Sequence, residues 1–120
     1  MEELIKLVQT IWIRLKICMR PCAVKLVNAD SVINIGPVLM HAICIAGDGA
    51  NADCDVYNGT NANATRKNHL EALSGTTFNW EPPCGVIFDL GVYVVVNATT
   101  TFIMVTYKPL THAEVEVLRQ

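Results

Sequence analysis

The chain has 120 residues, 52% of them hydrophobic, and its nine Lys and Arg against eleven Asp and Glu give a formal net charge of −2. This length and apolar content are typical of a single domain with its own hydrophobic core. The basic residues are scattered along the chain, which argues against nucleic acid as a partner because phosphate binding needs clustered cations.

The first twenty residues carry two overlapping periodicities. Aliphatic residues and Met occupy every second position from Ile11 to Met19, which is the period of a strand. A helix running through Met19 would instead place a set of apolar residues on one face: Leu4, Leu7, Ile11, Leu15 and Cys18. We favour the strand and leave the helix open. Pro21 then separates an N-terminal arm, residues 1–21, from a body of residues 22–120.

Neither a membrane span nor an export signal is predicted. The longest uncharged stretches, 31–47 and 90–107, are interrupted by Gly, Pro, Asn or Thr, so each reads better as strands than as about 20 continuous apolar residues. Two Glu residues at the start, and Arg14 and Lys16 further on, are atypical of a signal peptide. We therefore expect a protein made and kept soluble without export, and no membrane partner.

The body reads as short strands separated by Gly, Pro, Asn and Asp residues. Strands are predicted at 23–27, 31–35, 38–46, 53–57, 69–73 and 76–80, with a polar loop at 60–68 and a last apolar alternation at Val115, Val117 and Leu118. The densest signal is Val86–Tyr107, in which two β-branched and aromatic runs flank the polar residues 97–100 and predict a β-hairpin. The fold class that follows is all-β, an antiparallel β-sandwich or jelly-roll-like barrel with an N-terminal arm.

Several of these segments resemble a β-sandwich domain found among small structural proteins of tailed bacteriophages. The resemblance covers roughly residues 25–109 and rests on Gly36–Ala42, Asp55–Thr60, Gly75–Trp80, Gly85–Phe88, Leu90–Val94 and Thr106–Tyr107. It implies a head-decoration or other accessory virion protein, made in the host cytoplasm and located in the virion. The N-terminal arm has no counterpart in that pattern, and five cysteines are unusual for it.

The resemblance also implies partners. They would be further copies of this chain and other virion proteins such as the major capsid protein. The arm would then supply the contacts, through Ile11, Trp12, Ile13, Leu15 and Ile17. The alternative from another functional class is a secreted or surface ligand-binding module, lectin-like, that uses loops 47–52 and 58–68. These loops contain almost no aromatic side chains, which favours the structural role.

The five cysteines leave two interpretations open. Cys18, Cys22, Cys44, Cys54 and Cys84 are either reduced thiols, as is usual for a protein made in the cytoplasm, or form disulfides after release into an oxidising medium. An odd number would leave one thiol to bridge to a neighbouring chain. Cys44 and Cys54 would lie close together if strands 38–46 and 53–57 paired.

No resident metal or cofactor is predicted. Asn51, Asp53 and Asp55 alternate and so share one face of a strand, with Asp48 nearby, which makes a weak calcium candidate. The EF-hand order lacks its Gly and its terminal Glu, so a solvated acidic loop is the better interpretation. His41 and Cys44 offer zinc ligands, but their odd separation places them on opposite faces of a strand.

Catalysis is not predicted either. His41, His69 and His112 occur in no local signature of a nucleophilic or acid–base site, and the sequence has no Gly-rich phosphate loop. We therefore expect a protein without enzymatic activity.

Overall fold

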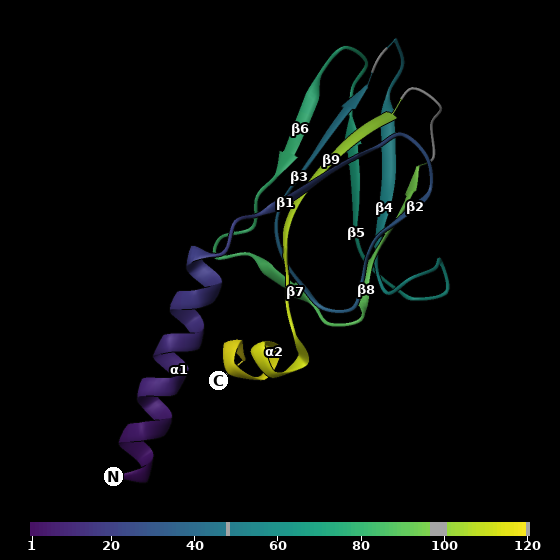
Figure 1. The fold of residues 1–120 in the computed structure, drawn as a ribbon. Coiled ribbons are helices and arrows are strands. Elements are labelled where there is room, and N and C mark those ends of the chain that lie inside the picture. Colours follow the sequence, from purple (N-terminus) through teal and green to yellow (C-terminus); the bar gives the residue numbers. More distant parts are fainter. Residues whose placement is uncertain (48, 97–100, 120) are drawn as a thin grey trace.

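The computed structural model describes residues 1–47, 49–96 and 101–119, and about half of these residues lie in two antiparallel sheets that pack as a sandwich (Figure 1). Helix α1 (Glu2–Met19) precedes the strands and helix α2 (His112–Leu118) follows them. The strands are β1 (Ala23–Val27), β2 (Ser31–Ile35), β3 (Val38–Gly47), β4 (Ala52–Asn58), β5 (Thr65–Ala72), β6 (Thr77–Trp80), β7 (Val86–Phe88), β8 (Gly91–Val96) and β9 (Thr101–Pro109).

One sheet has the strand order β1-β9-β3-β6, with β7 also paired to β3, and the other has the order β2-β8-β4-β5. β6 pairs with residues 43–46 of β3 and β7 with residues 38–40, so the two short strands follow one another along the same edge of β3. The bend between them contains Cys84 and Gly85, both with positive φ (61° and 77°). Gly85 has no room for a Cβ, which would lie 2.9 Å from Leu39 Cδ1.

The core lies between the two sheets because the strands alternate buried and outward residues. In β4, for example, Ala52, Cys54 and Val56 are buried while Asp53 and Asp55 point outward. The largest fully buried side chains in this layer are Phe88, Met40, Ile43, Ile45, Ile103, Val38, Val56, Val92, Val94 and Val105. The predicted sandwich-like, mostly β architecture is therefore confirmed.

The predicted hairpin within Val86–Tyr107 is wrong, although its strands are present. β8 pairs with β2 and β4, whereas β9 pairs with β1 and β3 in the opposite sheet. The chain therefore crosses between sheets after β8. Four residues can span up to about 13 Å, which exceeds the roughly 10 Å between packed sheets, so a short polar linker fits a crossover as well as a hairpin. Residues 97–100 themselves lie outside the described residues.

Two further predictions fail near the chain's polar segments. The loop predicted at 60–68 ends earlier, because β5 begins at Thr65 with the exposed side chains of Arg66 and Lys67. A strand at the edge of a sheet tolerates such polar residues, which hid it in the sequence.

The apolar alternation near the C-terminus is the helix α2. Thr111 and Glu114 form a capping box at its start, a T-x-x-E signal that the alternation obscured.

The preference for a strand over residues 11–19 is also wrong, and the N-terminal segment is a helix packed on the body rather than an extended arm. Helix α1 has Glu2 and Glu3 in its first turn and Lys16 in its last, which suits the helix dipole, and Arg20 and Pro21 follow its end. Ile17 is buried against Leu110 and Val115 in a second, smaller core. Tertiary packing thus decides between the two periodicities.

Lys108 joins this helix to the sandwich. Its ammonium, on a residue only 7% exposed, donates to the carbonyls of Ile17 and Cys18, each at 3.0 Å. These carbonyls belong to the last turn of α1, where the dipole favours a cation, and the Ile17 carbonyl also accepts from the Arg20 backbone N–H at 3.2 Å. Lys108 follows the core residues Val105 and Tyr107 in β9, so the end of α1 is held against the sandwich itself.

Replacing Lys108 by Met should lower the free energy of unfolding by about 1–3 kcal/mol, because two helix carbonyls lose their buried donor. The measurement is urea denaturation followed by circular dichroism. Lys67→Met, on the exposed side of β5, is the matched control and should change stability by less than about 0.5 kcal/mol. Equal stability of the two variants would contradict the capping role of Lys108.

Candidate functional site

Helix α1 exposes a continuous apolar surface, called the apolar face below. It consists of Met1, Leu4, Ile5, Leu7, Val8, Ile11, Trp12, Leu15 and Met19, whose exposed fractions run from 48% for Leu15 to 91% for Met1. At about 100° per residue these positions, with the exposed Cys18 among them, cover roughly 160° of the helix circumference. No charged side chain falls within that arc. Large contiguous apolar surfaces of this kind mark interaction sites.

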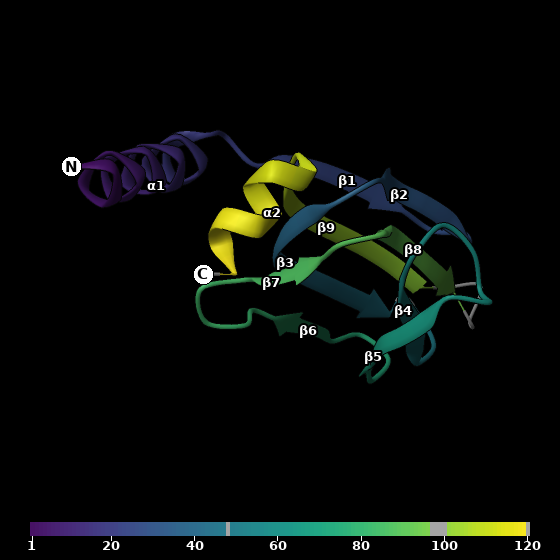
Figure 2. The same cartoon turned by 90° about the horizontal axis from the view of Figure 1, so that it is seen from below.

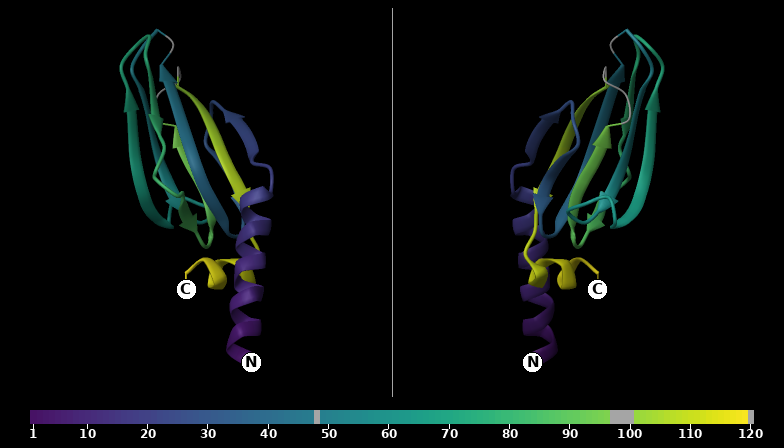
Figure 3. Two further views of the ribbon diagram at one scale, coloured as in Figure 1. Left: turned by 90° about the vertical axis from the view of Figure 1, so that its left-hand side faces the viewer. Right: turned by 90° about the vertical axis from the view of Figure 1, so that its right-hand side faces the viewer.

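The body contacts a different side of the helix. Ile13 and Ile17 pack against α2, and the Arg14 guanidinium donates to the Val117 carbonyl at 3.2 Å. Helix α1 projects beyond the end of the sandwich, and its N-terminus lies far from the sheets (Figure 3). The apolar face is therefore left uncovered by the described part of the chain.

The spacing on the apolar face follows a heptad. Met1, Val8 and Leu15 occupy the a positions, while Leu4, Ile11 and Cys18 occupy the d positions. This alternation of three and four residues is the seam of a coiled coil. Of the residues predicted to contact neighbours, Ile11 and Leu15 lie on the seam and Trp12 beside it, whereas Ile13 and Ile17 are used within the chain.

A charged contact fixes how α1 leaves the body. The Arg20 guanidinium, just after α1, donates to both carboxylate oxygens of Glu114 at 3.0 and 2.5 Å and to the Pro109 carbonyl at 2.7 Å. Figure 2 shows α2 beside the sandwich end from which α1 departs. The hydrogen bond from Arg20, with support from the Thr111 backbone, holds the pKa of Glu114 below its usual value. The carboxylate is thus ionised and paired at neutral pH.

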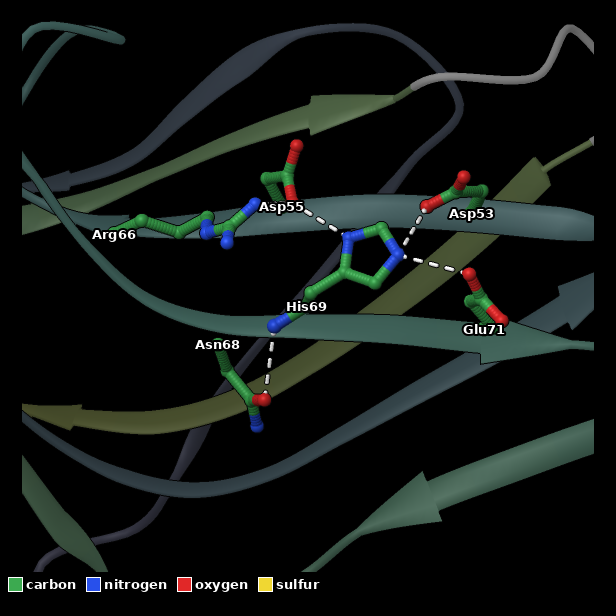
Figure 4. Close-up of polar contacts among 6 residues, drawn as sticks. All are labelled: Asp53, Asp55, Arg66, Asn68, His69 and Glu71. Atoms are coloured by element: carbon green, nitrogen blue, oxygen red, sulfur yellow. Dashed lines mark hydrogen bonds and ion pairs between the residues drawn. The ribbon is translucent and has the colours of Figure 1, made fainter.

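A polar cluster occupies the outer face of the other sheet, on β4 and β5 (Figure 4). The His69 ring places Nδ1 at 2.6 Å from Asp55 Oδ1, and Nε2 at 3.0 Å from both Asp53 Oδ1 and Glu71 Oε1. Arg66 donates to Asp55 at 3.2 Å. Hydrogen bonds to Asp55 and Glu71 raise the pKa of His69 above its usual value, opposed by a smaller effect of burial. The side chains of His69 and Asp53 are about one third exposed, so solvent reaches this cluster.

The structure does not bring the residues of the weak calcium candidate together at one point. Asp53 and Asp55 share the outward face of β4, as their spacing predicts, and both approach His69. Asn51 Oδ1 instead accepts from the Ser74 backbone at 2.9 Å. Asp48 lies outside the described residues. The sequence missed His69 and Glu71 as neighbours of these carboxylates, because only the β4–β5 register places them opposite.

The cysteines lie apart, and no pair among the described residues is at disulfide distance. Cys44 and Cys54 belong to different sheets, since β3 and β4 do not pair. Burial raises the pKa of the Cys54 thiol to about 12, which keeps it protonated. Cys18, Cys22 and Cys84 are exposed, so any disulfide would have to join two chains.

His41 and Cys44 do not form a metal site with other described His, Cys, Asp or Glu residues. His41 sits at a β-bulge in β3, where its Nε2 is buried without a hydrogen-bond partner. Burial, together with the nearby Lys108 charge, lowers the pKa of His41. Its imidazole is therefore neutral at physiological pH.

No family model matches the chain, and no curated protein matches its sequence. Among the described residues, no helix combines the length and the hydropathy that a membrane span requires.

Replacing Glu114 by Gln should destabilise the protein at pH 7 by about 1–2 kcal/mol, because the paired carboxylate is lost while Gln can still serve in a capping box. Because the pKa of Glu114 is lower in the folded state than in the unfolded chain, its ionised carboxylate stabilises the folded state above the unfolded value of about 4.3. This stabilisation is lost as the pH falls through the folded-state pKa. The difference from wild type should therefore shrink below about pH 4, measured by urea denaturation.

The control for this experiment is Glu116→Gln, an exposed position on the same helix. It removes the same charge without removing the contact to Arg20. If Glu114→Gln were as stable as Glu116→Gln at pH 7, where the carboxylate of Glu114 is ionised, the Arg20–Glu114 contact would not hold α1 in place.

Proposed function

We propose that this protein is a non-enzymatic structural subunit that self-associates through α1. The observation that carries the proposal is the uncharged apolar face with its unbroken heptad seam. Burying such side chains from water releases about 25 cal/mol for each Å² of apolar surface, so a partner on this face is strongly favoured. The body would then be the part that faces the surroundings.

A second copy of the same chain is the partner that fits the face best. Heptad spacing matches another helix with the same spacing, and each seam residue then packs into a hole between four residues of its neighbour. An apolar arc of roughly 160° is wider than the narrow a/d stripe, which favours a bundle of three or more helices over a pair. Because α1 projects from one end of the body, parallel helices would keep the sandwiches together at one end of the bundle.

The strand order supports the finer description of the body as a jelly roll. The sheets β1-β9-β3-β6 and β2-β8-β4-β5 correspond to eight strands in two four-stranded layers, with β7 continuing β6 along β3. Viral capsid and lectin domains use this architecture. Together with the motif resemblance to phage sandwich domains, it favours an accessory or decoration protein of a virion, with the major capsid protein as a further partner.

The self-association proposal predicts a defined oligomer in solution. Size-exclusion chromatography with light scattering should give a mass of two or more chains for the wild type, and the monomer mass for Val8→Asp combined with Ile11→Asp. Two carboxylates in adjacent seam layers would be buried without partners in a bundle. Circular dichroism should show that the variant keeps its strands, since both side chains are exposed in the single chain.

Gln9→Asp is the matched control, because position 9 lies on the polar side of α1, outside the apolar arc. It should leave the oligomer unchanged. A wild-type protein that stays monomeric at high micromolar concentration contradicts the proposal. Binding of that monomer to phospholipid vesicles would then assign the apolar face to a membrane surface.

Parallel, in-register packing makes a separate prediction for Cys18. This residue occupies a d position, where side chains of neighbouring helices meet in one layer. Mild oxidation should therefore give a covalent dimer on non-reducing gels, and Cys18→Ser should abolish it. Cys84→Ser, which changes another exposed cysteine on the body, should leave the dimer intact. A dimer that persists in Cys18→Ser and is lost in Cys84→Ser would exclude the parallel arrangement.

A further inference from the structure

The β4–β5 register creates an electrostatic conflict on the outer face of the sheet. Asp53 lies directly opposite Glu71, and Asp55 directly opposite His69. Like charges in directly opposite positions of an antiparallel pair destabilise it. The three carboxylates therefore need positive charge among them, and the structure places the His69 ring at the centre (Figure 4).

Asp55 sets the orientation of the His69 ring through the ring nitrogen Nδ1. Asp55 holds Nδ1 at 2.6 Å and is itself contacted by Arg66. A carboxylate that accepts from one ring nitrogen fixes the tautomer in which the other nitrogen carries the lone pair. In the neutral ring, Nε2 then presents a lone pair to two carboxylate oxygens, and three electron-rich atoms converge on one point.

We propose that Asp53, His69 and Glu71 bind a divalent transition-metal ion, with Asp55 orienting the imidazole. Their ligand atoms lie within 4.8 Å of one another, and Nε2 is 3.0 Å from each carboxylate oxygen. Tetrahedral zinc with bonds of about 2.0 Å separates its ligands by about 3.3 Å, so small side-chain rotations suffice. Binding would replace the proton on Nε2 and release it to solvent.

The ligand set also limits which metal fits. One imidazole nitrogen with two carboxylates suits zinc, cobalt or manganese better than calcium, which takes six to eight oxygen ligands. Three protein ligands leave at least one position open. The cluster borders two surface depressions, one lined by Asn51, Ala52, Asp53, Glu71, Ala72 and Leu73 and the other by Asn68, His69, Leu70, Glu71, Phe78 and Trp80. Solvent or a ligand atom from another molecule can reach the open position from either side.

Zinc chloride titrated into the 120-residue chain tests the site, with isothermal titration calorimetry giving the zinc affinity of each variant and NMR of the His69 ring locating the ion. The exposed thiols also bind zinc, so the titration uses protein with Cys18, Cys22 and Cys84 replaced by Ser. We expect saturable shifts of the His69 ring resonances and a zinc affinity at least tenfold weaker in His69→Ala. His112→Ala, at an exposed position on α2, should retain the wild-type affinity.

The second pair of variants tests the carboxylate ligands. Glu71→Gln should weaken zinc binding several-fold, whereas Glu116→Gln should not. No saturable change at His69 up to millimolar zinc would overturn the proposal, and so would an affinity in His69→Ala within twofold of wild type. Tighter binding of calcium than of zinc would also overturn it, because the nitrogen ligand would then play no part. Each result is independent of the oligomeric state.

Discussion

The buried ammonium of Lys108 sets the direction in which α1 leaves the sandwich. It binds the final carbonyls of the helix from a position in β9 next to core residues, so the helix end cannot move without disturbing the sheet. Arg20 and Glu114 add a second point of attachment a turn away. Two points determine an axis, and the small apolar core around Ile17 fixes the rotation about it. The contacts between α1 and the body therefore determine that the apolar face of α1 points outward.

The molecule carries an apolar surface and a polar cluster on different elements. The apolar face belongs to α1, which is held by residues of β9 and α2, whereas the His69 cluster lies on β4 and β5 in the opposite sheet. A partner on the helix would consequently leave the polar cluster accessible. The proposed self-association and the proposed metal binding would therefore not exclude one another, and a metal with an open coordination position could accept a group from a neighbouring molecule.

The sequence predicted most strands because their alternation is local, and it failed where the answer depended on distant contacts. β1 and β2 match their predicted bounds residue for residue. The pairing of β8 and β9 could not be read, since a polar linker serves a hairpin and a sheet crossover equally well. Residues 11–19 fit both helix and strand, and Leu110 and Val115, about a hundred residues away, select the helix. His69 was predicted to lie on a strand, but only the register between β4 and β5 places it beside Asp53 and Asp55, and the polar residues 65–68 concealed the first half of β5.

The cationic residues along β5 have a consequence for the geometry of any assembly. This strand is one of the two edge strands of its sheet, and the exposed Arg66 and Lys67 discourage an edge strand of another molecule from pairing with it. Strand addition at this edge is thereby disfavoured, and α1 offers the larger apolar surface for association. Helices that pack around a common axis form a closed ring of subunits, whose number is limited by the width of the apolar arc. The proposed association through α1 would therefore give a finite cluster instead of a fibre.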